Sequence, residues 1–167
     1  MTRFTYGLEF EVTSISPRDA ANVITDGGVY CEYISNGIHE TNDSWKAVHD
    51  GSVAGAEVVS PILTAARLNE VTRVTRVLTT HGARVDSSTG FHVHVGARAF
   101  ASEGVSQNEV LAQFVLNYYG VHHAIAAMVS NSRLRNRFCR VLDRNRAEQD
   151  AEFIRNGSLG SSVGDRY

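Results

Sequence analysis

The sequence predicts an α+β fold in which helices cover one face of a mainly antiparallel β-sheet. Three observations support this class of fold. Several short segments alternate apolar and polar residues with the period of two that is typical of strands. Two of these segments flank an Asp-Gly-Ser turn, which favours an antiparallel hairpin. Two longer segments, residues 65–81 and 107–130, repeat their apolar residues with helical spacing.

The first predicted strand covers residues 3–13, "RFTYGLEFEVT". Side chains i and i+2 point to the same side of a strand, so its residues divide between two faces. One face is apolar and should contact the core: Phe4, Tyr6, Leu8, Phe10 and Val12. The other face places Glu9 and Glu11 side by side, about 7 Å apart along the strand. Two such carboxylates repel each other unless a cation lies close to them.

A short helix and three strands are predicted next. Ser16 and Pro17 suit the N-cap and the first position of a helix beginning in "SPRDAANVI", and "VYCEYI" predicts a short strand. Residues 45–50 and 54–60 are the two strands of the predicted hairpin. Pro61 closes the second of them, because proline cannot donate a hydrogen bond to the sheet.

Residues 65–81 form the next predicted helix, and Gly82 marks its C-terminal end. The segment "GFHVHVGA", residues 90–97, alternates as a strand. Its apolar side carries phenylalanine and two valines, and its other side carries two histidines.

A long helix is predicted at residues 107–130, where Ser106 and Glu109 form a capping box. A further helix, rich in arginine, is expected at roughly residues 133–154, before a tail with the composition of a loop.

Composition sets limits on the function. The 167 residues suit one domain, and the net charge of −2 gives no electrostatic reason to expect nucleic acid as a partner. Cys31 and Cys139 lack metal-type spacing and are expected to be reduced thiols. The chain has no apolar run of about 18 residues and no apolar signal-peptide core at its start. We therefore expect a cytoplasmic protein without membrane contact.

Acids and imidazoles from separate predicted strands share the polar face of the sheet: Glu9, Glu11, Glu57, His92 and His94, with Asp50 and Ser52 in the hairpin turn. Each motif alone is more typical of a solvated sheet face than of a site. Their combination favours a site, because carboxylates with one or two imidazoles suit Mg²⁺ or Mn²⁺ better than structural Zn²⁺. The sequence therefore predicts that divalent ions lie between these side chains.

Three segments carry a resemblance to a known family: "YGLEFEV", "HDGSVAGAEVVSPIL" and "TGFHVHVGA", in that order. Together they resemble the amidoligase family, a branch of the carboxylate–amine ligases with a glutamine synthetase-like catalytic domain. The resemblance covers roughly residues 4–140 and extends weakly into the tail. It implies one catalytic domain over residues 1–167 that uses ATP and Mg²⁺ to form an amide or isopeptide bond.

Transferred to matching positions, the resemblance also implies roles for individual residues. Glu9, Glu11, Glu57 and His92 would be the metal ligands, with His92 close to the nucleotide phosphates. His94 would contact the phosphates or the acyl acceptor.

The hairpin turn and the arginine-rich segment complete the implied site. Asp50 and Ser52 would lie near the amine substrate, and Asp50 is the candidate base for the amine proton. Arg133 or Arg137 would face phosphate or carboxylate, with Arg133 also assigned to the nucleotide.

The family pattern continues beyond an Arg-Tyr pair into a further strand with an arginine, whereas this chain ends at Tyr167. We therefore expect a domain that lacks its last strand and leaves a sheet edge exposed. A fragment, a shortened inactive relative and a second chain that completes the sheet all fit this expectation.

Three functions are compatible with these residues. The first is the ATP-dependent ligase, which would join a carboxylate-bearing small molecule or peptide to an amine donor. The second is a metal-dependent hydrolase, in which the same acids and histidines activate water. The third is a non-catalytic relative that acts as a binding or assembly module. Peptides, cell-wall fragments and protein tails all remain candidate substrates.

Overall fold

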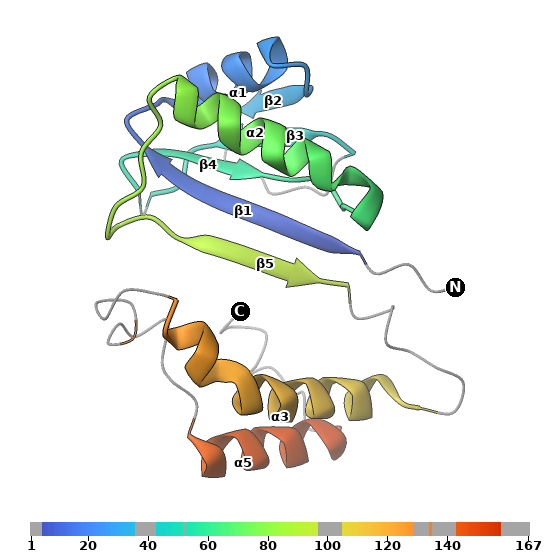
Figure 1. The fold of residues 1–167 in the computed structure, drawn as a ribbon. Coiled ribbons are helices and arrows are strands. Elements are labelled where there is room, and N and C mark those ends of the chain that lie inside the picture. The colour runs from blue at the N-terminus through green and yellow to red at the C-terminus, as the bar shows by residue number, and fades with distance from the viewer. Residues whose placement is uncertain are drawn as a thin grey trace. The chain divides into compact units, whose positions relative to one another are not determined.

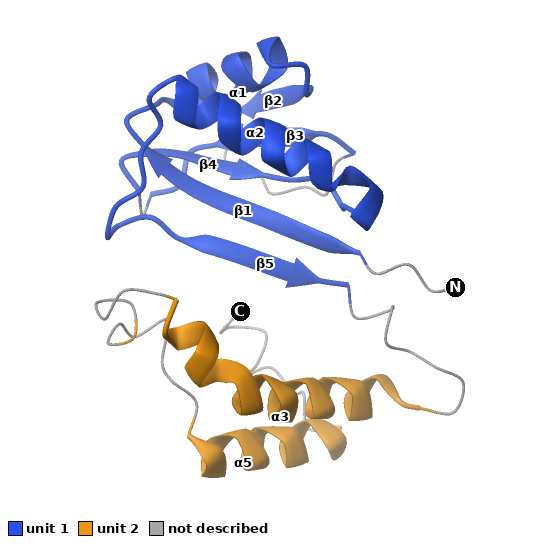
Figure 2. Ribbon diagram, in the orientation of Figure 1, with its two compact units in different colours: residues 1–96 blue, residues 97–167 orange. Residues whose placement is uncertain are grey.

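The computed structural model describes residues 5–35, 43–51, 53–96, 105–128, 134 and 143–157. The chain divides into two compact units, residues 1–96 and residues 97–167 (Figure 2). The described residues of the first unit form a sheet with two α-helices, and those of the second form two further helices. This composition confirms the predicted α+β class, whereas the prediction of a single domain stays a prediction.

The first unit contains a five-stranded sheet of order β2-β3-β4-β1-β5 (Figure 1). The strands are β1 (Tyr6–Thr13), β2 (Cys31–Ile34), β3 (Trp45–Val48), β4 (Gly55–Val59) and β5 (Phe91–Val95). All neighbours pair antiparallel except β2 and β3, which are parallel. The predicted hairpin is present as the antiparallel pair β3 and β4. The sheet is therefore mainly antiparallel, as the sequence predicts.

Strand β1 is the strand with the most extensive pairing. It pairs with β4 over Glu9 to Thr13 and with β5 over Tyr6 to Phe10. Isolated bridges continue this pairing at both ends, from Tyr6 to Leu63 and from Thr13 to Arg84. The strand that carries both predicted glutamates is thus fixed along its whole length.

Helices α1 (Pro17–Asp26) and α2 (Leu68–Thr80) cover one face of the sheet, and a short 3₁₀ turn, η1 (Ala65–Arg67), precedes α2 (Figure 1). The N-cap prediction for α1 is confirmed, because the Ser16 hydroxyl accepts a hydrogen bond from the Asp19 amide at 3.1 Å. Gly82 follows α2 with φ of +88°, a left-handed conformation that suits glycine at a helix end.

The core of the first unit lies between these helices and the sheet. Its largest fully buried side chains include Trp45, Ile24, Val58 and Val74, and each buried aliphatic side chain contributes about 1.5–3 kcal/mol. Phe10 stacks on Trp45 with ring centroids 6.2 Å apart. The packing therefore joins α1 and α2 to the centre of the sheet.

The apolar side of β5 is not buried in this core. Phe91, Val93 and Val95 lie on the same side as the core residues of β1, as the alternation predicts. They nevertheless remain 59%, 54% and 45% exposed. The reason is that α1 packs on β2, β3 and β4, away from the edge that β5 forms.

The second unit contains α3 (Gln107–Ala126) and α5 (Arg144–Arg155), which pack around Ala112, Ala151 and Ile154. The Ser106 hydroxyl caps α3 by accepting a hydrogen bond from the Glu109 amide at 3.1 Å.

The Glu109 carboxylate accepts two hydrogen bonds from Arg155, at 2.8 and 3.1 Å, and so links the two helices. None of the helices in the described segments has the length and hydrophobicity needed to cross a membrane.

Candidate metal centre

The sheet face opposite α1 and α2 carries the predicted acids and histidines. On this face, the register places Glu9 between Val59 of β4 and His92 of β5. Two residues further along β1, Glu11 lies directly opposite Glu57. Cross-strand neighbours on one face have Cβ atoms about 5 Å apart. The side chains of Glu9, Glu11, Glu57 and His92 are therefore close enough to share an ion.

The first group of candidate ligands contains Glu9, Glu57 and His92. Each offers one ligand atom, and the three atoms lie within 4.8 Å of one another. Glu9 is oriented by both histidines of β5: its Oε2 lies 2.8 Å from His92 Nδ1, and its Oε1 lies 3.0 Å from His94 Nε2. The alternating histidines therefore position the central acid of this group.

The second group contains Glu11, Asp50 and Glu57, whose ligand atoms also lie within 4.8 Å of one another. Glu11 and Glu57 are buried, and Asp50 is half-buried. The Gly90 amide donates a hydrogen bond to Glu11 Oε2 at 2.5 Å. A Cβ on Gly90 would lie 3.1 Å from the same oxygen, so glycine allows this close approach.

Glu57 belongs to both groups, so the two candidate sites share one carboxylate. Burying several carboxylates together is unfavourable unless cations neutralise them. The donors are mainly carboxylate oxygens with one imidazole, a set that suits Mg²⁺ or Mn²⁺. The residues present therefore fit the divalent ions that the sequence predicts.

The electrostatics of Glu9 reflect its two histidines. Partial burial raises the pKa of Glu9, but the hydrogen bonds and positive charge of His92 and His94 more than offset this effect. The pKa of the Glu9 carboxyl therefore lies below its ordinary value, and the group is ionised near neutral pH.

The structure brings together six of the predicted site residues: Glu9, Glu11, Asp50, Glu57, His92 and His94. Ser52, Arg133 and Arg137 lie outside the described residues. For these six residues, the structure shows that the side chains lie close together. Their individual roles remain predictions.

Two further residues of this face do not follow from the sequence motifs. Gly90 supports Glu11 through its backbone, and its position directly before the histidine strand is the one signal for it. Lys46 is a polar residue in the apolar run "WKAV", and it is only 4% exposed in the structure. A charged residue at an alternate position of a buried strand was the available signal for Lys46.

The α+β unit carries two adjacent groups of candidate metal ligands on one sheet face. This combination defines a candidate divalent-metal protein. The chain matches the model of a family described as "Putative amidoligase enzyme" over residues 2–163, and it belongs to that family. This match confirms the resemblance carried by the three sequence motifs and supports a ligase in general terms. The comparisons with curated proteins and with solved structures gave no match.

Proposed function

We propose that this protein is an ATP- and Mg²⁺-dependent carboxylate–amine ligase that forms an amide or isopeptide bond through an acyl phosphate. The observation that carries the proposal is the pair of ligand groups joined by Glu57. Two adjacent divalent ions are a recurrent device for phosphoryl transfer. Family membership supports the ligase class.

The first ion would be held by Glu9, Glu57 and His92, and the second by Glu11, Asp50 and Glu57. When bound, these ions would neutralise the negative charge that develops on the transferred phosphoryl group. His94 is exposed beside Glu9 and is available to donate a hydrogen bond to a phosphate oxygen or to the acyl acceptor.

The reaction has two chemical steps. A carboxylate oxygen of the substrate attacks the γ-phosphorus of ATP, and ADP leaves. The amine nitrogen then attacks the acyl carbon, the phosphate leaves, and the amine loses one proton. Asp50 is our candidate acceptor of that proton, through the carboxylate oxygen that it does not offer to the second ion, and Ser52 follows it two residues further along the chain. Arg133 and Arg137 are proposed to face phosphate or carboxylate oxygens.

Titration with Mn²⁺ tests the shared carboxylate, with calorimetry as the measurement. We expect the wild-type protein to bind two ions, Glu9→Gln to lose one, and Glu57→Gln to weaken both. Glu32→Gln is the matched control, because Glu32 is an exposed acid of β2 outside both groups. Equal behaviour of Glu57→Gln and Glu32→Gln would contradict the proposed site.

Phosphate release from ATP tests the reaction class. A ligase should release phosphate slowly with Mg²⁺ alone and faster with a carboxylate and an amine, and Glu57→Gln should lose both rates. Cleavage of peptide or ester substrates without nucleotide would instead identify a metal-dependent hydrolase. Binding of neither metal nor nucleotide would leave the non-catalytic module as the function.

A further inference from the structure

Lys46 is a nearly buried lysine on the same sheet face as the metal ligands. Lys46 is 4% exposed as a whole residue. In the sheet it lies between Glu32 of β2 and Val59 of β4. Among the described residues, no hydrogen bond or ion pair engages its ammonium group. Lysine commonly buries its methylene stem while its ammonium stays in contact with solvent.

The methylene stem of Lys46 lies beside valines, and its register neighbour on β2 is the acid Glu32. Val48 is the next residue on the same face of β3, and Val59 lies directly opposite. The Lys46 stem is buried, but its ammonium is not enclosed, so an anion that reaches this face can contact it.

The register connects Lys46 to the candidate metal centre. One row of the sheet runs from Lys46 through Val59 and Glu9 to His92, and Glu57 is diagonal to Lys46 across β3 and β4. Lys46 and His92 are therefore three strand spacings apart, roughly 14 Å between backbones. A cation and an imidazole thus flank the central acids from opposite sides.

This arrangement suits a ligand with several anionic groups in a chain. A single carboxylate is too short to meet both ends of the row, whereas a phosphate chain carries anionic oxygens on successive phosphorus atoms. Lysine is a common point-charge partner for phosphate. The metal ions would contact such a chain from the acids between Lys46 and His92.

We propose that Lys46 binds the phosphate chain of the nucleotide, opposite His92 and next to the shared carboxylate Glu57. The inference rests on the proposed function, because it assigns one substrate of that reaction to a new residue. It predicts opposite effects of the lysine charge on the two ligands. The charge attracts the anionic phosphates and repels the divalent ions.

Calorimetry of Lys46→Met with Mn²⁺ and with inorganic triphosphate tests this proposal. We expect triphosphate binding in the presence of Mn²⁺ to weaken roughly ten- to a hundredfold, as for loss of a charged hydrogen bond. Binding of Mn²⁺ alone should be unchanged or tighter, and the thermal midpoint should stay close to that of the wild-type protein. Lys46→Arg, which keeps the charge, should retain most of the triphosphate affinity.

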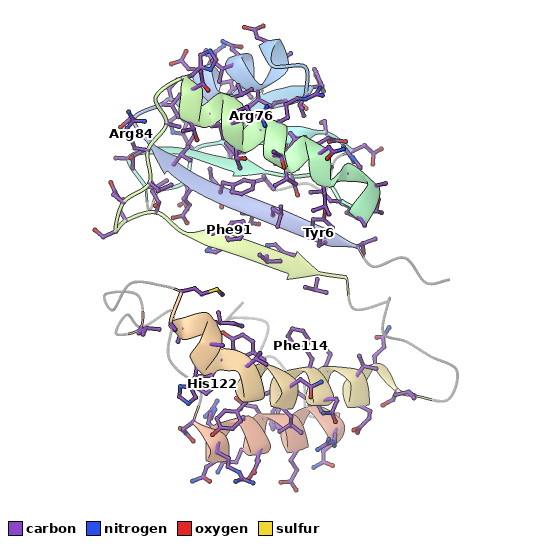
Figure 3. All side chains as sticks on the ribbon, viewed as in Figure 1. Tyr6, Arg76, Arg84, Phe91, Phe114 and His122 are labelled. Carbon is purple, nitrogen blue, oxygen red and sulfur yellow. The ribbon has the colours of Figure 1, made fainter. Side chains whose placement is uncertain are left out.

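Arg76→Met is the matched control, because it removes one positive charge from the exposed side of α2 (Figure 3). Unchanged triphosphate affinity in Lys46→Met would overturn the inference. Loss of both Mn²⁺ binding and thermal stability in this variant would also overturn it, because that result indicates a structural role for the lysine. If the wild-type protein binds no Mn²⁺, the proposed function fails. Triphosphate binding without metal then decides whether Lys46 contacts phosphate.

Discussion

The two histidines of β5 hold the pKa of Glu9, an acid of the candidate metal centre, below its ordinary value. Its two oxygens each contact one histidine of β5, at 2.8 and 3.0 Å. Both histidines are more than half exposed in their side chains, so solvent screens these contacts. The pairs therefore orient Glu9 more than they stabilise the fold.

A lowered pKa predicts how stability depends on pH. A carboxyl whose pKa is depressed by folding contributes stability above its unfolded pKa, and the contribution is lost as the pH falls through the folded value. Without metal, Glu9→Gln should thus lower the free energy of unfolding by up to about 1 kcal/mol at pH 7. The difference from wild type should begin to shrink as the pH falls below the ordinary glutamate pKa of about 4.3, and it should vanish only below the lower folded pKa.

Urea unfolding of both proteins in a chelator, at several pH values, measures this difference. A destabilisation of the same size at pH 7 and at pH 3.5, or one that grows as the pH falls, would contradict the assigned role of the histidines.

The motif residues could be located from the sequence because alternation fixes the face on which a side chain lies. Glu9, Glu11, His92 and His94 all follow from period two alone. Lys46 could not be located in this way, since its importance depends on which strands flank β3. That information comes from pairing between distant segments and not from local pattern.

At the level of elements, the β1–β4 pair depends on a glycine. Gly55 begins β4 opposite Thr13, and a Cβ placed there would lie 2.0 Å from the Val12 carbonyl oxygen. No side chain can occupy that space without moving backbone. Because Glu57 lies two residues further along β4, this close approach also sets the position of the shared carboxylate.

Gly55→Ala should therefore destabilise the protein by about 1–3 kcal/mol and weaken binding of both Mn²⁺ ions. Denaturant unfolding and metal titration give the two readouts. Gly120→Ala provides a contrast, because a Cβ on Gly120 of α3 meets no atom within 4 Å. Alanine should raise stability there by about 0.5–1 kcal/mol and leave metal binding unchanged. Similar effects of the two substitutions would contradict the steric argument.

The sequence predicts the elements themselves better than their partners. The predicted hairpin strands at 45–50 and 54–60 correspond to Trp45–Val48 and Gly55–Val59. The parallel pairing of β2 with β3 did not follow from local pattern, because alternation is the same in parallel and antiparallel strands.

At the scale of the whole molecule, each compact unit has a core of its own. The first core is large and is centred on Trp45, Val58 and Val74, whereas the second is built around Ala112, Ala151 and Ile154. All six described acids and histidines of the candidate metal centre belong to the first unit. Damage to the second core should therefore spare metal binding.

Ile154→Ala should destabilise the packing of α3 against α5 by about 2 kcal/mol or more, because the side chain is only 9% exposed. Faster tryptic cleavage within α5, at Arg144 or Arg146, would report this loosening. Calorimetric Mn²⁺ binding should be equal to that of the wild-type protein. Loss of metal affinity in this variant would show that the second unit contributes ligands.

The fold class followed from the sequence because alternation and helical spacing both reflect burial on one side of an element. The exposure of Phe91, Val93 and Val95 did not follow, since an apolar alternation indicates a face but not what covers it. Which strands are covered depends on where α1 and α2 lie over the sheet. That position is a property of the assembled unit.

The double pairing of β1 has a consequence for how the site can move. With β4 on one side, β5 on the other and bridges at both ends, the amide protons of β1 should be among the slowest in the chain to exchange with deuterated water. Backbone fluctuations then contribute little around Glu9 and Glu11. The site would therefore adjust to an incoming ion or substrate by rotation of its side chains.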